Sequence, residues 1–396
     1  MKTDKIVEIA EKLSLTALFY GIVESAPMQA FLEYCEYTEL AQKRKAYAKF
    51  VAEIYHAGGD LTEWTKTAVF ENENAYVKRI ASGEKPEPCI TDSVWRELTA
   101  FAEFAALTTE DFAQDLGLKS SELPAFSSRK EDFVKAYAER MKNVSKYGYG
   151  IFSASGMFRL SDDCKIEKIL SADRIGMEQF IGYERERQQI VDNTRAFVNG
   201  KPAANTLLCG DAGAGKSSTV KAVANAFFDD GVRLIELRKD QLRYLPYVMG
   251  AVSGNPLKFI IFIDDLSFNQ NDDNFSMLKA VLEGSASAKA DNVVIYATSN
   301  RRHIIKESFQ DREGDDVHRN DTLQETMSLS ERFGLVVLFS KPDKAAYLNI
   351  VRGLAERFGL TIPQTELDIR AEAFALRKGN RSARCAEQFI DSLLRE

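Results

Sequence analysis

The stretch "NTLLCGDAGAGKSSTVKAVANAFF", residues 205–228, decides the fold of this chain, because it joins a buried strand to a helix through a loop rich in glycine. Residues 206–209 are a short apolar run, and the residues after 217 repeat apolar side chains at helical spacing. Between these two segments, residues 210–217 match the phosphate-binding pattern GxxxxGK[ST] at every fixed position. The sequence therefore predicts a strand, a phosphate-binding loop and a helix in direct succession.

This loop suits a nucleoside triphosphate. Glycine lets the backbone turn its N–H groups toward the phosphates, and the helix that follows points its positive N-terminal end at the same anion. Lys216 is expected to reach the β and γ phosphates, and the Ser217 hydroxyl to help hold Mg²⁺. The alternative, a glycine-rich turn with a surface lysine, does not explain the position between a strand and a helix. The predicted nucleotide-binding residues of the loop are Gly210, Asp211, Ala212, Gly213, Ala214, Gly215, Lys216, Ser217 and Ser218.

Two carboxylates end the next buried strand, in "FIIFIDDL", residues 259–266. In an open parallel sheet the carboxyl ends of the strands form the edge where ligands bind. We therefore expect Asp264 to serve Mg²⁺ together with Ser217, and Asp265 to polarise the attacking water, a role usually filled by the longer glutamate. An Asx turn at the end of the strand is the alternative, and it suits Asp265 alone better than the pair.

A further apolar run, "VVIYATSN" at 293–300, ends in small polar residues. Asn300 could position water near the γ phosphate, with Thr298 or Ser299 as lesser candidates. Taken alone, an asparagine in this place is typical of a turn that follows a strand.

Two arginines in the last part of the chain each allow two interpretations. Arg332 stands at the end of a helix, just before the last core strand, and could cap that helix, form a surface ion pair or act as an arginine finger in a neighbouring subunit. Arg384 falls in the first turn of a helix that Ser382 would cap. Because a positive charge there opposes the helix dipole, we expect Arg384 to have another partner.

Outward from these motifs, the chain divides into four segments. Residues 1–147 repeat apolar side chains at helical spacing and predict an all-α N-terminal domain. Residues 148–175 are predicted to form an extended linker. Short β-branched runs alternate with helical segments over 176–342, which predicts an α/β core of three layers around a parallel sheet. Residues 343–396 return to helices and predict a small helical lid.

Composition and charge argue against several classes of protein. The chain has 396 residues, a formal net charge of -7 and five cysteines without CxxC spacing, which argues against a disulfide framework and against a zinc site. No apolar run is long enough to span a membrane, and the N-terminus is amphipathic and acidic. We therefore expect a cytoplasmic protein with no membrane partner. The acidic balance does not indicate nucleic-acid binding, although a local basic face would allow it.

The order of these motifs resembles the AAA+ ATPase superfamily. In that comparison residues 210–217 are the Walker A loop, residues 259–265 are Walker B, and the two sensors and the arginine finger fall on Asn300, Arg384 and Arg332. More narrowly, residues 176–396 resemble bacterial ATPases catalogued as domain of unknown function 815. The segments that carry this likeness are "FIGYERERQQIVDNTRAFVNGKPAANTLLCG", "IDDLSF", "YATSNRRHI" and "LSERFGLVVLFSKPDKAAYLNIV".

The resemblance implies further roles. Ile181 would lie in the short segment that contacts adenine, Arg384 would sense the γ phosphate from the lid, and Asp265 departs from the usual glutamate. It implies a homo-oligomer that binds ATP and ADP, uses Mg²⁺ and remodels an unidentified protein client. A nucleotide-gated scaffold with little turnover and a DNA-associated ATPase of the helicase-loader type remain alternatives. No NKxD motif occurs, which disfavours a GTPase, and the sensor and finger arginines disfavour a small-molecule kinase.

Overall fold

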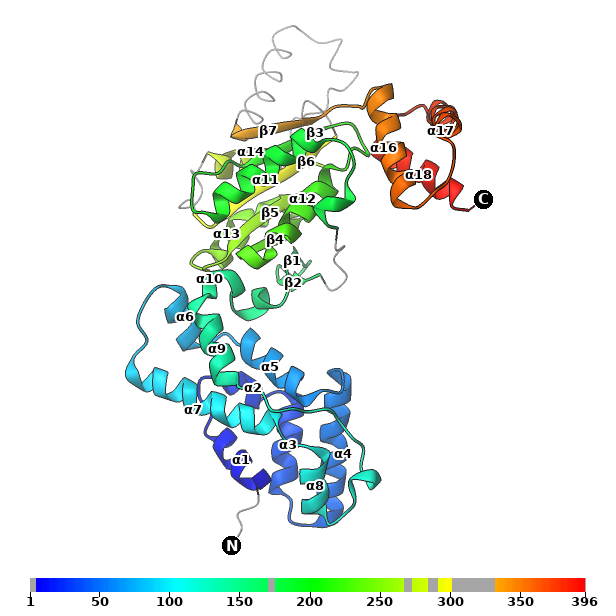
Figure 1. Ribbon diagram of the computed structural model, residues 1–396. Helices are drawn as coiled ribbons and strands as arrows, with labels where there is room; N and C mark the ends of the chain where they lie inside the picture. The colour runs from blue at the N-terminus through cyan, green and yellow to red at the C-terminus, as the bar shows by residue number, and fades with distance from the viewer. Residues whose placement is uncertain (1–4, 170–174, 267–272, 284–290, 301–331, 396) are drawn as a thin grey trace. The chain divides into compact units, whose positions relative to one another are not determined.

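The computed structural model describes residues 5–169, 175–266, 273–283, 291–300 and 332–395 (Figure 1). The chain separates into two compact units, Met1–Ala154 and Ser155–Glu396. The division of the second unit into core and lid stays a prediction.

The first unit is helical, as the periodicity predicts, and it packs around aromatic rings. Phe31, Phe50 and Phe112 are fully buried and contact one another at centroid distances of 5.6–6.4 Å, which suits tilted and edge-to-face packing. Its elements are α1 (Lys5–Ser14), α2 (Tyr20–Val23), α3 (Ala26–Glu36), α4 (Leu40–His56), α5 (Leu61–Glu71), α6 (Ala75–Ala81), α7 (Pro88–Ala105), α8 (Thr109–Leu116), the 3-10 helix η1 (Ser120–Glu122), α9 (Phe133–Lys142), α10 (Val144–Tyr147) and η2 (Gly150–Ser153).

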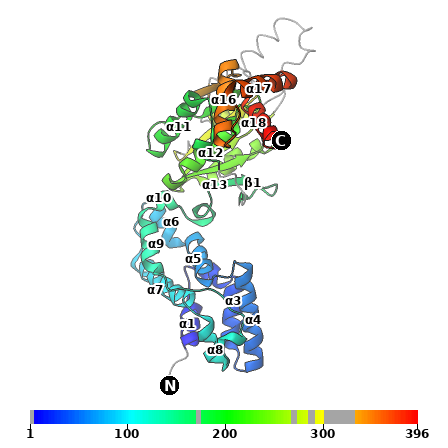
Figure 2. The same cartoon turned by 45° about the vertical axis from the view of Figure 1, so that its right-hand side comes forward.

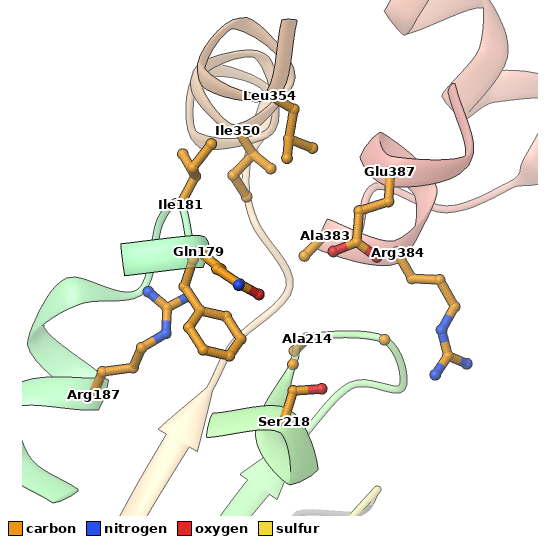
Figure 3. A pocket seen from close by; sticks show the side chains of 13 residues that line it. Gln179, Ile181, Arg187, Ala214, Ser218, Ile350, Leu354, Ala383, Arg384 and Glu387 are labelled. Carbon is orange, nitrogen blue, oxygen red and sulfur yellow. The ribbon is translucent and has the colours of Figure 1, made fainter. Parts of the chain in front are cut away.

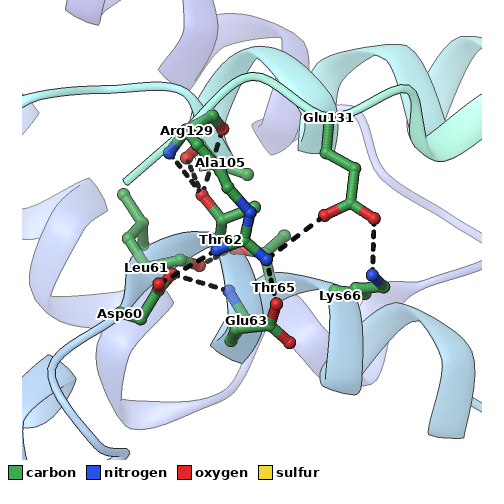
Figure 4. A network of polar contacts seen from close by, with 9 residues as sticks. All are labelled: Asp60, Leu61, Thr62, Glu63, Thr65, Lys66, Ala105, Arg129 and Glu131. Atoms are coloured by element: carbon green, nitrogen blue, oxygen red, sulfur yellow. Dashed lines mark hydrogen bonds and ion pairs between the residues drawn. The ribbon is translucent and has the colours of Figure 1, made fainter. Parts of the chain in front are cut away.

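A polar network ties the segment before α9 to the start of α5 (Figure 4). Thr62 donates its hydroxyl to the Ala105 carbonyl at 2.9 Å and accepts from the backbone N–H of Arg129 at 2.9 Å. The Arg129 guanidinium also pairs with Asp60 at 3.0 Å and with Glu63. Because Thr62 is fully buried, its two bonds satisfy polar groups that water cannot reach. The network is structural, and no role in binding follows from it.

The second unit is built on a seven-stranded sheet of order β2-β1-β4-β5-β6-β3-β7. All neighbouring strands are parallel except β1 and β2, so the predicted parallel sheet is confirmed. The strands are β1 (Met157–Leu160), β2 (Ile166–Lys168), β3 (Thr206–Gly210), β4 (Val232–Leu237), β5 (Lys258–Ile263), β6 (Val293–Ser299) and β7 (Leu335–Phe339).

The segment predicted as an extended linker, 148–175, contains β1 and β2. Met157, Phe158 and Leu160 are at most 3% exposed, and β1 adds to the sheet beside β4. Burial of these apolar side chains against the core gives the segment a fixed place that an extended linker would lack.

Helices cover the sheet and form the lid. Those of the core are η3 (Met177–Gln179), α11 (Glu184–Val198), α12 (Lys216–Ala226), η4 (Phe228–Asp230), η5 (Lys239–Tyr244), α13 (Leu245–Val252) and α14 (Asp273–Leu282). Apolar side chains of α11 and α12 pack with those of β3, β4, β5, β6 and β7 in one buried cluster. Successive residues of β5 from Phe259 to Ile263 are fully buried, so both faces of this central strand are covered, as a three-layer core requires.

The last three helices, α16 (Lys344–Arg357), α17 (Gln364–Lys378) and α18 (Ala383–Leu393), share a buried cluster of their own (Figures 1 and 2). The predicted α/β core around a mainly parallel sheet, the C-terminal helical lid and the N-terminal all-α domain are confirmed. No helix in the described parts of the chain is both long and apolar enough to cross a membrane.

Candidate functional site

The glycine-rich loop leaves β3 at Gly210 and enters α12 at Lys216, the transition that the sequence predicts. Gly210 has φ +139°, and a Cβ there would lie 2.0 Å from the carbonyl oxygen of Phe339 on β7. Gly213 and Gly215 have φ +79° and +81°, in the left-handed region that side chains disfavour. All three positions therefore require glycine, which explains the pattern of the loop.

The Lys216 ammonium folds back over this loop and is only 5% exposed. It donates to the carbonyls of Gly210 at 2.9 Å and Asp211 at 2.8 Å, and to the Asn300 side-chain oxygen at 3.0 Å. Burial lowers the pKa of Lys216, although neighbouring carboxylates act in the opposite direction. The loop thus holds a largely desolvated cation against backbone carbonyls, where an incoming phosphate would be a stronger acceptor.

The two predicted Mg²⁺ ligands meet at the carboxyl end of β5. Asp264 Oδ1 accepts hydrogen bonds from the Ser217 hydroxyl at 2.6 Å and from the Thr298 hydroxyl at 2.5 Å. Carboxylate and hydroxyl oxygens fit Mg²⁺, which usually keeps several waters and binds one or two protein ligands plus phosphate oxygens. Among the described residues, no group of three or more His, Cys, Asp and Glu side chains could form a larger metal cluster. The donor set therefore suits a shared Mg²⁺–nucleotide site.

The side chains of Asp265 and Asn300 lie together beside this pair. Asn300 donates its amide N–H to Asp265 Oδ1 at 2.7 Å, while its oxygen accepts from Lys216. One amide therefore joins the lysine of the loop to the second carboxylate of the β5 strand end. Asp265 has φ +51°, an uncommon backbone conformation for a residue other than glycine, although aspartate and asparagine tolerate it best.

A cleft opens between the loop and the lid (Figure 3). Ile181, Ile350 and Leu354 form an apolar wall, and Ala214 and Ser218 lie below them. Ile181 therefore lines the cleft, and its predicted contact with adenine stays a prediction. The remaining lining residues are Gln179, Phe180, Arg187, Gly213, Gly215, Ala383, Arg384 and Glu387.

Sequence reasoning missed the lid side of this wall. Ile350 and Leu354 lie one turn apart on α16, and this spacing also suits an ordinary buried helix face, so it gave no separate signal. Phe180 stands next to Ile181 in the segment already singled out, and the Arg187 guanidinium lies 4.6 Å from the centre of its ring. The sequence does not reveal that contact, because it depends on how α11 packs against the segment before it.

Arg384 is the second residue of α18 and lines the cleft. Its backbone N–H donates to the Gly213 carbonyl at 3.1 Å, so the lid touches the loop directly. Ser382 caps the helix by accepting from the Cys385 N–H at 3.2 Å, as predicted. In Figure 3 the Arg384 guanidinium extends away from the apolar wall. The structure therefore brings Arg384 to the loop, while its role as a sensor of the γ phosphate stays a prediction.

Arg332 is the one predicted catalytic residue that the structure does not bring to this site. It precedes β7, and the pairing of Gly210 with Phe339 puts the loop at the other end of that strand. Five residues of strand span about 17 Å. The Arg332 guanidinium pairs with Glu283 just after α14, at 2.5 Å. The structure therefore places the Arg332 guanidinium away from the loop of its own chain, and its role as an arginine finger stays a prediction.

Comparisons with known proteins gave one family and distant structural neighbours. The family model described as "Protein of unknown function (DUF815)" matches residues 154–396. No curated protein matches the chain significantly. Among solved structures, the chain is 12% identical to the Thermotoga maritima RuvB Holliday junction branch migration motor, with a TM-score of 0.35 over 55% of this chain and 72% of that one. It is 17% identical to AMPPCP-bound DnaA from Aquifex aeolicus, with a TM-score of 0.38 over 56% of this chain and 65% of that one.

Proposed function

Because this chain belongs to the DUF815 family, whose description names no activity, its function must be inferred from the site, and we propose that it binds ATP with Mg²⁺ and hydrolyses it. One observation carries the proposal. Lys216 and Ser217 lie at the loop, Asp264 and Asp265 follow β5, and Asn300 follows β6, yet hydrogen bonds of 2.6–3.0 Å connect these three segments at one edge of the sheet.

Binding uses the loop and the cleft together. The adenosine lies against the apolar wall of Ile181, Ile350 and Leu354, and the phosphates follow the loop toward Lys216. Lys216 exchanges its neutral carbonyl acceptors for phosphate oxygens, and hydrogen bonds between charged groups contribute roughly 1.5–3 kcal/mol each. The absence of an NKxD motif supports adenine over guanine as the base.

In the proposed hydrolysis, each polar side chain has a separate role. Asp265 accepts a proton from water as its oxygen attacks the γ phosphorus, the bond between that phosphorus and the β–γ bridging oxygen breaks, and ADP and inorganic phosphate leave. Asn300 orients the water and the γ phosphate. When bound by Ser217 and Asp264, Mg²⁺ neutralises charge that develops on the phosphate oxygens.

The position of Arg332 supports an oligomer with shared sites. The guanidinium lies at the opposite end of β7 from the loop of its own chain, so in the proposal it completes the site of a neighbouring subunit. An arginine supplied in this way stabilises the charge of the transition state. Movement of the lid, which contacts the loop through Arg384, would transmit hydrolysis to an unidentified protein client.

A second candidate function is a nucleotide-gated scaffold with little turnover, and the conformation of Asp265 favours it. The side chain is a methylene shorter than glutamate, and its Oδ1 is already engaged by Asn300 at 2.7 Å. A carboxylate that stayed bound to this amide would accept a proton from water less readily. Such a protein would bind ATP tightly and release it unchanged.

Replacement of Lys216 by alanine tests the proposal. Calorimetric titration with ATP and Mg²⁺ should show at least a hundredfold loss of affinity, because the loss of two charge-assisted hydrogen bonds is worth about 3 kcal/mol or more. Lys221→Ala is the matched control, since Lys221 lies on the same helix α12 and pairs with Glu236 at 3.2 Å. Its ATP affinity should stay within twofold of that of the unchanged protein.

Titration and single-turnover mixing together distinguish a wrong loop assignment, a general defect and a scaffold without turnover. An unchanged affinity in Lys216→Ala would refute the assignment of the loop, and equal losses in both lysine variants would show a general defect. If ATP binds tightly but single-turnover mixing yields no phosphate, the scaffold replaces the ATPase. Titration with GTP should give a markedly weaker affinity if the cleft selects adenine.

A further inference from the structure

Thr298 contacts both aspartates that follow β5, one through its carboxylate and the other through its backbone. It is the sixth residue of β6 and is 2% exposed. Its hydroxyl donates to Asp264 Oδ1 at 2.5 Å and accepts from the backbone N–H of Asp265 at 3.0 Å. The Thr298 carbonyl accepts from the Leu266 N–H at 2.7 Å. One residue therefore holds three successive residues of the neighbouring strand end.

The direction of these bonds is determined by their partners. The Asp265 peptide N–H can only donate, so the Thr298 oxygen accepts there and has one proton left to give to Asp264. Branching at Cβ restricts the side-chain rotamer of threonine, and burial restricts it further. The hydroxyl is therefore a fixed link between a carboxylate and the peptide that follows it.

We propose that Thr298 is a positioning residue for Mg²⁺ binding, an inference that rests on the proposed function. The Ser217 hydroxyl donates to the same Asp264 oxygen at 2.6 Å, and its oxygen keeps lone pairs with which it could bind the metal. Thr298 is the second side-chain donor to that oxygen, and it is not itself a proposed metal ligand. Residues that orient a metal ligand in this way typically change metal affinity by 10–100-fold when they are replaced.

Thr298 also fixes the backbone of Asp265. This residue has φ +51°, and its N–H is shared between Thr298 Oγ1 at 3.0 Å and Asp264 Oδ1 at 3.1 Å. A left-handed backbone at a residue with a side chain persists where its surroundings determine it. The same hydroxyl thus aims the metal ligand and holds the backbone of the candidate general base.

Thr298→Val removes the hydroxyl and keeps the shape of the side chain. The readout is ATP affinity, measured by calorimetry with Mg²⁺ and again with excess EDTA, because the ratio of the two isolates the contribution of the metal. We expect the gain in affinity on adding Mg²⁺ to fall at least tenfold in Thr298→Val. The metal-free affinity should stay within twofold, and Thr298→Ser, which keeps the hydroxyl, should restore most of the gain.

Thr194→Val is the matched control. Thr194 is also fully buried, and its hydroxyl bonds to the Ile190 carbonyl at 2.8 Å and to Tyr296 Oη at 2.7 Å, apart from the carboxylate pair. This variant loses a buried hydroxyl of the same unit, and its Mg²⁺-dependent gain should not change. Thr298→Ala is measured in parallel. Alanine also lacks the hydroxyl, so this variant still tests the inference if Thr298→Val does not fold.

Four results would overturn the inference. An unchanged Mg²⁺ gain in the valine and alanine variants would show that Asp264 needs no help from Thr298. Equal losses with and without the metal, or an equal loss of the Mg²⁺ gain in Thr194→Val, would show a general role in folding. If the unchanged protein itself gains no affinity from Mg²⁺, the proposed function fails first and the inference fails with it.

Discussion

Alanine at Gly213 tests the contact between the loop and the lid. Gly213 has φ +79°, and a Cβ there would lie 3.0 Å from the Cβ of Arg384 and 3.3 Å from the Ser382 hydroxyl. The Arg384 Cβ is fixed to the backbone of α18 and cannot turn aside as the end of a long side chain could. The added methyl group must therefore move the lid away from the loop.

Gly254 offers a control for the backbone strain alone. Its φ is +78°, nearly that of Gly213, but an added Cβ would have nothing within 4 Å. A left-handed conformation costs a residue with a side chain roughly 1–2 kcal/mol. Both alanine variants should therefore lose about this much free energy of unfolding, and melt about 2–8 °C lower, since a unit of this size shifts by roughly 2–4 °C per kcal/mol.

The two variants should differ in ATP binding. Overpacking of a well-fitted contact costs about 1–3 kcal/mol. In Gly213→Ala this cost destabilises the state in which the lid contacts the loop. If ATP is bound in that state, its affinity should fall by roughly 5- to 150-fold in calorimetry. Gly254→Ala should bind ATP like the unchanged protein. Wild-type affinity in Gly213→Ala, or an equal loss in both variants, would refute the argument that lid contact is needed for binding.

Two further substitutions test the catalytic assignments. The ATP affinity of Asp265→Asn should lie within about threefold of that of the unchanged protein. The variant should retain the ATP, because the amide cannot accept a proton from water. In a filter-binding assay, the bound radiolabel should remain ATP for many turnover times of the unchanged protein. Normal phosphate release by that variant would move the general-base role to another group. Arg332→Ala should leave ATP affinity within twofold, since Arg332 lies at the far end of β7 and pairs with Glu283. A tenfold loss in dilute solution would contradict a role confined to a neighbouring subunit.

Much of the core could be predicted from local patterns. The short β-branched runs within 176–342 are residues 206–209, 232–237, 259–263, 292–297 and 335–339. They agree with β3, β4, β5, β6 and β7 to within two residues at each end. Strands buried on both faces are nearly continuous apolar runs, so their sequences differ clearly from those of the flanking helices. The approach of the loop and the β5 and β6 strand ends follows from the rule that ligand sites form at the carboxyl edge of such a sheet.

Features that depend on side-chain contacts between distant segments could not be predicted. Thr298 was a lesser candidate for a water-positioning role, yet its hydroxyl bonds to Asp264 and the Asp265 N–H across two strands. The pairing of Arg332 with Glu283 joins residues 49 positions apart, and neither residue type signals it. The addition of β1 to the sheet likewise depends on an open edge at β4, which the composition of 148–175 does not reveal.

The measurement that tests the account most directly is ATP turnover per subunit as a function of protein concentration, with the mass of the assembly recorded in parallel. We predict that turnover of the unchanged protein rises as subunits assemble. Arg332→Ala should assemble to the same mass, but its turnover should be lower by about 10³-fold or more, the usual contribution of an arginine finger. Turnover that stays independent of concentration, or that survives in Arg332→Ala, would contradict a site completed by a neighbouring subunit.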